Sequence, residues 1–367
     1  MNITGYSSKN YRNLKDPSFS PDSGINIIFG ENGQGKTNMV ESVWMMTGCH
    51  SFRTHKCSEL ISAGQKQARV KLIFDSRGFS NEGEIKISDK REFYLNKVPY
   101  ENSRKFLGVF QAVVFSPSSL SIIQNAPSER RRFLDIAVSM TRPVYASHLI
   151  RYSKILANRN ALLKQIASGK ADENSLSPWD DALSMTGAEI VGCRLEYLKN
   201  ISPVSSEIYK EISGGKEEMK VKYLASCKDV DDCGDKKEIA DNIYESLRKN
   251  RENDIKRLMT SNGPHKDDLY ITVGDRSARI YGSQGQQRSC ALALKLSEAD
   301  MIKKINGEYP VILLDDVMSE LDFGRQKSLL DYLKNRQVFI TCCDINQFSS
   351  LDRYASFKIE NGEVKTG

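Results

Sequence analysis

The hydrophobic positions near the N-terminus predict a strand, a glycine loop and a helix, in that order. Residues 25–29 form a short apolar run that ends at Gly30, which is typical of a buried strand. Over residues 37–46 apolar side chains recur at helical spacing, and Gly48 is placed to end that helix. Short runs within residues 69–100 are divided by turn residues, which indicates a small antiparallel meander.

Beyond this segment the pattern becomes helical and then returns to strands alternating with helices. From about residue 127 to 250 helical patterns dominate, interrupted by prolines and glycines. Later, apolar strands over 311–314 and 338–340 are separated by one helical pattern. Strand, helix and strand in that order predict two parallel neighbours joined by a right-handed crossover.

The length of the chain favours more than one compact body. A chain of 367 residues exceeds the usual size of one domain, so two lobes are expected. We therefore predict an α/β fold in which residues 1–125 and 256–367 form one discontinuous lobe. Residues 126–255 are expected to form a second, largely helical lobe.

Composition says more about the cellular compartment and the partners of the protein than about its activity. No apolar stretch approaches the roughly 20 residues of a membrane span, and the N-terminus lacks the features of a signal peptide. The eight cysteines include no C-x-x-C pair, which favours reduced thiols over disulfides or zinc. We expect a cytoplasmic protein without a membrane partner, and its net charge of +6 permits a polyanionic one.

The glycine loop after the first strand matches the phosphate-binding pattern G-x-x-x-x-G-K-[ST] without a gap. Its glycines let backbone N–H groups converge on phosphates, and the next helix directs its positive end to the same place. Lys36 is expected to bind the β- and γ-phosphates of ATP, and Thr37 to bind Mg²⁺. The expected nucleotide-binding residues of the loop are Gly30, Glu31, Asn32, Gly33, Gln34, Gly35, Lys36, Thr37 and Asn38.

A second pattern lies at the apolar strand 311–314, which runs into two carboxylates. A buried strand of this kind can carry Asp315 to the Mg²⁺ shell, and Asp316 can then orient or polarise the attacking water. Lys36 and Asp316 are therefore catalytic candidates, while Thr37 and Asp315 are metal-ligand candidates.

A third pattern indicates the type of ATPase. Residues 281–287 read Tyr-Gly-Ser-Gln-Gly-Gln-Gln and precede a helical pattern. This loop resembles the ABC signature S-G-G-Q, and residues 319–322 resemble the D-loop that follows a Walker B strand. The order P-loop, signature, Walker B and D-loop is that of an ABC/SMC-type ATPase head. The candidate signature residues are Ser283, Gln284, Gly285 and Gln286.

The chain further resembles the RecF family of bacterial DNA-repair ATPases over nearly its whole length. The similar segments are residues 10–13, 30–38, 51–54, 115–117, 127–135, 159–163 and 263–268. The resemblance implies a weak, DNA-stimulated ATPase that forms an ATP-dependent homodimer on double-stranded DNA near single-strand gaps and junctions. Each signature would complete the γ-phosphate site of the other subunit, and RecR with RecO would be partners in recombinase loading. It also implies that Arg12 and Asn13 touch the nucleotide.

Basic residues provide candidates for contacts with DNA phosphates. Residues 129–167 contain eight Lys/Arg and only two acids. Such side chains on one face would give salt-sensitive, sequence-independent affinity. The same residues would equally suit a solvated helix face or ion pairs within the protein. The candidates are Arg53 and Lys56 in one cluster and Arg130, Arg131, Arg132, Arg151, Lys154, Arg159 and Lys164 in the other.

Some assignments stay open at this level. The Q-loop glutamine has Gln111 as its candidate, and residues 341–344 read Thr-Cys-Cys-Asp where transporter ATPases carry a switch histidine. The alternatives are the ATPase subunit of an ABC transporter, a non-catalytic nucleotide-binding scaffold and the head of an SMC-like nuclease complex. The missing histidine, and Asp316 in place of the usual glutamate, argue against the transporter.

Overall fold

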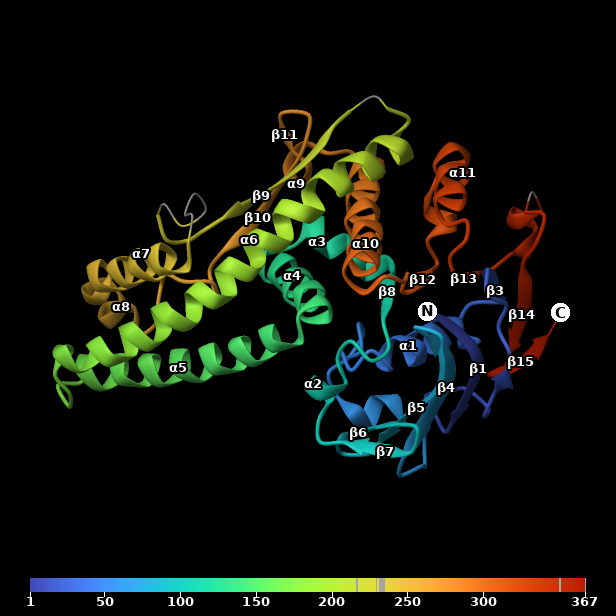
Figure 1. Cartoon of the computed structure of the whole chain (residues 1–367), viewed down its shortest axis with the longest axis horizontal. Helices are drawn as coiled ribbons and strands as arrows, with labels where there is room; N and C mark the ends of the chain where they lie inside the picture. Colours follow the sequence, from blue (N-terminus) through green and yellow to red (C-terminus); the bar gives the residue numbers. More distant parts are fainter. Residues whose placement is uncertain (216, 229, 231–234, 350, 367) are drawn as a thin grey trace. The chain divides into compact units, whose positions relative to one another are not determined.

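The chain forms two units (Figure 1). The computed structural model describes residues 1–215, 217–228, 230, 235–349 and 351–366. The first unit contains residues 1–120, 204–218 and 283–367, and the second contains residues 121–203 and 219–282.

The first unit is built on a six-stranded sheet of order β15-β14-β3-β13-β12-β8. Neighbouring described strands are parallel except for the antiparallel pair β14 and β15. The central strands are apolar and almost wholly buried, as a parallel sheet covered on both faces requires. The strands predicted at residues 25–29, 311–314 and 338–340 are confirmed. The bounds are β3 Ile25–Phe29, β8 Ala112–Phe115, β12 Val311–Asp315, β13 Val338–Cys342, β14 Ala355–Glu360 and β15 Glu363–Thr366.

A second sheet of this unit is antiparallel, with the order β2-β1-β4-β5-β6-β7. It contains the meander predicted within residues 69–100 and extends it by two N-terminal strands. Buried and exposed residues alternate along β4, as in a sheet with one face on the core. The bounds are β1 Asn2–Lys9, β2 Ser18–Phe19, β4 Ala68–Ser76, β5 Phe79–Ile87, β6 Arg91–Leu95 and β7 Val98–Tyr100.

One helix of the first unit, α1 (Lys36–Met45), contacts both sheets, through β8, β12 and β13 on one side and β4 on the other. Because α1 begins at the glycine loop, its packing fixes that loop to the parallel sheet. The other helices are α2 Ser103–Phe106, α10 Gln284–Asn306 and α11 Phe323–Tyr332, with the 3₁₀ turns η1 Cys57–Leu60, η2 Pro117–Leu120, η4 Met318–Glu320 and η5 Ile345–Phe348.

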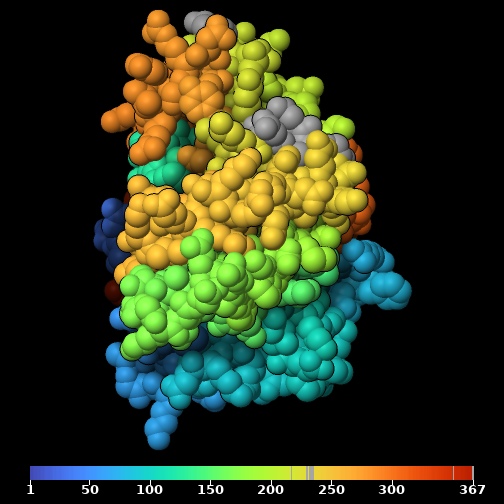
Figure 2. All heavy atoms as spheres, turned by 90° about the vertical axis from the view of Figure 1, so that its left-hand side faces the viewer, coloured from blue at the N-terminus to red at the C-terminus, as the bar shows by residue number. Residues whose placement is uncertain are grey.

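The second unit combines helices with a three-stranded antiparallel sheet of order β11-β10-β9. Helix α8 lies beside α5, and α7 lies beside α8, on the face that Figure 2 presents. The bounds are α3 Ser121–Gln124, α4 Pro127–Thr141, α5 Pro143–Ala167, η3 Glu173–Leu176, α6 Ser177–Ser213, β9 Met219–Leu224, α7 Lys236–Lys249, α8 Arg251–Arg257, β10 Asp268–Val273, β11 Arg276–Ser277 and α9 Ala278–Tyr281.

The boundaries between the units differ from the expected ones. The second unit extends to residue 282 instead of 255, because β10 pairs with β9 along its whole length. The last part of α6, residues 204–213, belongs instead to the first unit. A strand that depends on a distant partner, and a helix shared by two units, leave no local mark in the sequence.

No helix among the described residues is long and apolar enough to cross a membrane. The described cysteines are free thiols, and Cys233 lies outside the described residues.

Two buried arginines organise the second unit. Arg194 donates to Asp135 at 2.8 Å, to the Tyr145 hydroxyl at 2.9 Å and to the Pro264 carbonyl at 2.8 Å. These contacts join α4, α5 and α6 to the segment before β10. Since a buried guanidinium must be paired to be tolerated, the segment around Pro264 is held in one arrangement.

The second of these arginines, Arg159, is fully buried on α5. Its Nε donates to Asp180 at 2.7 Å, and its Nη1 donates to Asp254 and to the Thr260 hydroxyl, each at 2.8 Å. Arg159 therefore joins α6 and α8 to α5. It is not the DNA contact that its charge suggested, because solvent does not reach it.

His265 lies within the segment that the two arginines hold. Its Nε2 faces the Thr260 carbonyl at 3.2 Å and its Nδ1 faces the Tyr152 hydroxyl at 2.8 Å. A neutral ring protonated at Nε2 satisfies both contacts. Burial lowers the pKa of His265 to about 4.

We predict that this histidine makes the second unit sensitive to acid. The unfolded chain binds the proton near pH 6.5 and the folded chain only near pH 4, so stability is fully present above pH 6.5 and is lost as the pH falls towards 4. Between pH 7 and pH 5 this group should lower the free energy of unfolding by about 2 kcal/mol. Urea unfolding at both pH values measures it. His265→Gln should remove that loss and His148→Gln should keep it; equal losses in both would contradict the assignment.

Candidate nucleotide site

The predicted P-loop connects β3 to α1 at the carboxyl edge of the parallel sheet. Gly30 has φ 151° and Gly35 has φ 119°, a region that favours glycine. A Cβ at Gly30 would lie 2.3 Å from the Ile359 carbonyl oxygen of β14. The first glycine is therefore required by packing as well as by the turn.

Lys36 places its ammonium group inside this loop. Its Nζ donates to the Gly30 carbonyl at 2.6 Å and to the Glu31 carbonyl at 2.8 Å, and the Cys343 thiol lies 3.7 Å away. The side chain is therefore held over the centre of the loop, where phosphate oxygens can take the place of these carbonyls.

The two metal-ligand candidates meet directly. The Thr37 hydroxyl donates to Asp315 Oδ1 at 2.9 Å, although 278 residues separate them in sequence. Burial raises the pKa of Asp315 above the ordinary aspartate value, and hydrogen bonds from Thr341 and Thr37 oppose that rise. A cation at this point would favour the ionised form of the carboxylate.

The spacing of these two oxygens fits Mg²⁺. Adjacent ligands of an octahedral ion with bonds of about 2.1 Å lie about 3 Å apart, and the Thr37 and Asp315 oxygens are 2.9 Å apart. Thr37 and Asp315 would thus occupy two neighbouring positions, with phosphate oxygens and water as the natural remaining ligands.

Thr341 is a site residue that sequence analysis did not single out. Its hydroxyl donates to Asp315 at 2.8 Å and accepts from the Asp316 N–H at 2.9 Å. Asp316 has φ 54°, and its carboxylate accepts from the Ser319 hydroxyl at 3.1 Å. Thr341 thus holds both acids at the end of β12. The available signal was its place directly after the predicted strand 338–340, which was expected to lie parallel to the Walker B strand.

Arg12 and Asn13, the N-terminal candidates for contact with the nucleotide, have different partners. Asn13 donates to the Gly33 carbonyl at 3.0 Å and accepts from Asn38 at 2.7 Å, so it braces the P-loop. Arg12 forms two bonds to the buried Glu41 carboxylate of α1, at 2.5 and 2.7 Å. This bidentate pair ties the segment to α1 and occupies the guanidinium edge that carries Nε and Nη2.

Arg53, expected as a DNA contact, also lies beside the P-loop. Its Nη1 donates to Asn38 Oδ1 at 2.6 Å, one residue after Thr37. The Ser51 hydroxyl accepts from the Arg53 N–H at 2.9 Å and donates to Glu41 at 2.5 Å. The exposed arginine is therefore anchored to the nucleotide site, while Lys56 in the same segment is exposed and pairs with Glu59 at 3.7 Å.

Gln111, the Q-loop candidate, does not belong to this site. It precedes β8, and its carbonyl accepts from the N–H of Val311, the first residue of β12. Asp315 lies at the other end of β12, about 13 Å along the strand. The Gln111 side-chain oxygen Oε1 accepts from Asn306 at 2.8 Å. Parallel pairing thus places Gln111 at the opposite edge of the sheet, and Ser116, which follows β8, at the edge that carries Asp315.

The signature residues form the start of α10. The Ser283 hydroxyl accepts from the Gln286 N–H at 3.2 Å, and Gln286 Oε1 accepts from the Ser283 N–H at 2.8 Å. This capping box leaves Ser283 and Gln284 exposed. A Cβ at Gly285 would lie 2.7 Å from Arg325, which pairs with Asp322 of the D-loop at 2.9 Å. The signature and the D-loop are therefore neighbours in the first unit.

The basic candidates of the second unit are not all available to DNA. Arg130 is buried, with bonds of 2.6 and 2.9 Å to Asp268, so its prediction as a DNA contact is wrong. Arg131 is half-buried and donates to the Asp267 carbonyl at 2.8 Å, and Arg132 is half-buried. Arg151 is exposed on α5.

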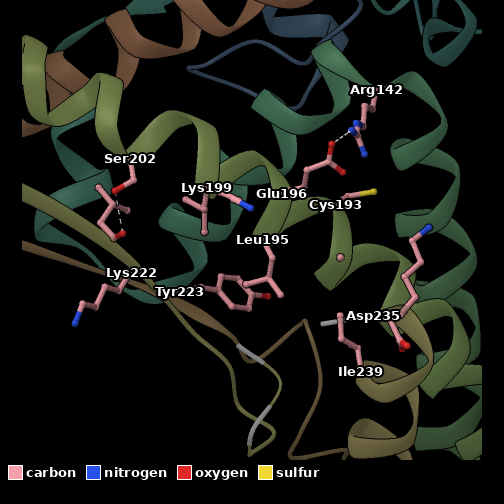
Figure 3. A pocket seen from close by; sticks show the side chains of 14 residues that line it. Arg142, Cys193, Leu195, Glu196, Lys199, Ser202, Lys222, Tyr223, Asp235 and Ile239 are labelled. Atoms are coloured by element: carbon pink, nitrogen blue, oxygen red, sulfur yellow. Dashed lines mark hydrogen bonds and ion pairs between the residues drawn. The ribbon is translucent and has the colours of Figure 1, made fainter. Parts of the chain in front are cut away.

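A separate cavity of about 860 Å³ lies within the second unit, between α6, β9 and the start of α7 (Figure 3). Its walls combine apolar side chains such as Leu195 with charged ones, including Lys199, Lys222 and the ion pair of Arg142 with Glu196. None of the nucleotide-motif residues lines this cavity.

Comparisons with known proteins agree over the whole chain. The family described as RecF/RecN/SMC N-terminal domain matches residues 2–366. The DNA replication and repair protein RecF of Clostridium perfringens strain SM101 is 37% identical over 360 residues, covering 97% of each chain. The RecF protein of Lachnospira eligens is 36% identical over 370 residues, covering 99% of each chain.

Solved structures extend the likeness to the fold. A structure of the recombination mediator protein RecF with ATP, from the RecFOR pathway, has a TM-score of 0.89 and 34% sequence identity. The alignment covers 100% of this chain and 99% of that one. An Smc head bound to the C-terminal winged-helix domain of ScpA has a TM-score of 0.58 at 18% identity, covers 100% of this chain and 97% of that one, and shares the fold alone.

We predict that Thr341→Val weakens cation and ATP binding, because it removes the hydrogen bonds that Thr341 makes with Asp315 and Asp316. The substitution leaves the Asp316 N–H without its acceptor and removes one donor from Asp315, which should cost about 1–3 kcal/mol of stability. It should also weaken Mg²⁺-dependent ATP binding about tenfold, because the Asp315 carboxylate loses a hydrogen bond that holds it in position for the cation. Calorimetric titration with and without Mg²⁺ measures the second effect. Thr341→Ser keeps the hydroxyl and should bind nearly as the wild type; wild-type binding by the valine variant would overturn this role.

Proposed function

The chain belongs to the RecF family, within the RecF/RecN/SMC group, and on that premise we propose that it is an ATPase that binds DNA in replication and repair. The observation that carries the proposal is the meeting of Lys36, Thr37 and Asp315 at one edge of the parallel sheet. The likeness to RecF proteins covers both units, and no observation favours the alternative of a transporter subunit.

The chemistry follows from the side chains at that edge. Lys36 would bind the β- and γ-phosphates in place of the two loop carbonyls that it now contacts. Thr37 and Asp315 would hold Mg²⁺, which would neutralise phosphate charge. Asp316 orients the attacking water, with Ser319 and Thr341 fixing its position. The shorter aspartate, where a glutamate is usual in transporters, supports slow hydrolysis.

A second copy of the chain completes the site. The Ser283 hydroxyl accepts a hydrogen bond within its own capping box, so its proton stays available to a phosphate oxygen. The start of α10 adds free N–H groups and the positive end of the helix dipole. We infer a head-to-tail homodimer in which each signature contacts the γ-phosphate bound to the other P-loop.

DNA is the proposed partner of this dimer. Lys56 and Arg151 are exposed cations without a buried structural role, and they suit phosphate contacts that ignore base sequence. Double-stranded DNA beside single-strand gaps and junctions, with RecR and RecO as protein partners, follows from the family resemblance. Hydrolysis then releases the dimer.

Two variants separate ATP binding from dimer release. Lys36→Ala removes the phosphate cation and should abolish ATP binding, whereas Asp316→Asn should bind ATP and remain dimeric because water activation is lost. Sedimentation velocity with and without ATP–Mg²⁺, and with and without a gapped duplex, measures the ATP-dependent dimerisation of each variant. A monomer in every condition, for the wild type and for Asp316→Asn, would overturn the proposed function.

For DNA, we predict that Lys56→Glu and Arg151→Glu together lower the affinity for a gapped duplex about tenfold or more. They should also reduce the slope of log affinity against log salt by about 2, since two phosphate contacts are lost. Fluorescence anisotropy over a salt series measures both quantities. Lys334→Glu reverses an exposed charge that pairs with Asp331 on the first unit and serves as the control. An equal loss in the control would show a general charge effect instead.

A further inference from the structure

A carboxylate from outside the signature loop holds one of the signature side chains. Glu217 follows the end of α6, and both of its oxygens accept from Gln286 Nε2, at 2.9 and 2.7 Å. Glu217 and Gln286 lie 69 residues apart in sequence and belong to the same unit. The contact therefore lies within the first unit, at the exposed start of α10.

This contact determines which way the Gln286 amide faces. A carboxylate accepts only, so it must be met by the NH₂ end of the amide. The carbonyl end is then left for the Ser283 N–H, which it accepts at 2.8 Å. If the amide turned over, an NH₂ group would face the Ser283 N–H and the capping box would be lost.

The carboxylate is itself held from α6. The Tyr209 hydroxyl donates to Glu217 at 3.3 Å, and Tyr209 is fully buried. Residues 204–213 of α6 belong to the first unit, while the earlier part of the same helix belongs to the second. The helix that holds Glu217 through Tyr209 thus continues towards its N-terminus into the second unit.

We propose that Glu217 is a positioning residue for the signature motif, acting through the Gln286 amide on the capping box of Ser283. This inference rests on the proposed function, because it concerns how the signature meets the nucleotide of a second copy. The side-chain contacts of Glu217 are with Gln286 and Tyr209, and not with the P-loop or the two acids at the end of β12. Glu217 therefore affects the association of two copies and leaves ATP binding by a single copy unaltered.

The test uses the full chain carrying Asp316→Asn, so that ATP-bound dimers accumulate. Adding Glu217→Ala should weaken ATP-dependent dimer association about tenfold, the order expected when a helix cap is lost in each protomer. Glu217→Gln keeps a carbonyl acceptor for Gln286 and should recover most of the affinity. Sedimentation equilibrium with ATP–Mg²⁺ measures association, and a fluorescent ATP analogue at protein concentrations below association measures binding by one copy, which should be unchanged.

Two controls fix the interpretation. Glu207→Ala removes an exposed charge from α6, the helix that precedes Glu217, and should associate as the parent does. Ser283→Arg blocks the signature itself and should abolish association. Parental association by Glu217→Ala, or an equal loss of single-copy ATP binding, would refute the positioning role alone. Failure of the Asp316→Asn parent to associate would refute the proposed function and this inference with it.

Discussion

The nucleotide site depends on the register of the parallel strands β3, β13 and β12. Asp315 is paired with Thr341, and Thr341 with Ile28, so that three chain segments end at one edge of the sheet. Because side chains alternate between faces, a shift of one residue would turn the Asp315 carboxylate away from Thr37. The P-loop, both acids and Thr341 are all placed by this pairing.

The second unit relies on paired buried charges to fix its helices. Arg159 and Arg194 each join three elements through short hydrogen bonds, and both are almost fully buried. A buried ion pair adds little net stability over apolar packing, but it is very unfavourable when one partner is missing. Such pairs thus select one arrangement of the helices, and they withdraw positive charge from any surface that meets DNA.

Helix α10 serves the core and the signature at once. Most of its residues are buried, including the ion pair of Lys295 with Glu298, and the helix contacts β8 of the parallel sheet. Its first residues are exposed and shaped by Ser283, Gln286 and Glu217. The body of the helix is therefore fixed by packing, whereas the orientation of its start is set by a few polar contacts.

The sequence by itself determined the strand, loop and helix around the P-loop, the strand that carries Asp315 and the loop that begins α10. Each of these is contiguous, and local spacing is enough to predict it. Only the tertiary structure decided that Gln111 lies at the wrong edge, that Arg130 is bound by Asp268 across 138 residues and that Thr341 holds both acids. A charge or a hydroxyl carries no local record of its distant partner, so burial and pairing decide its role.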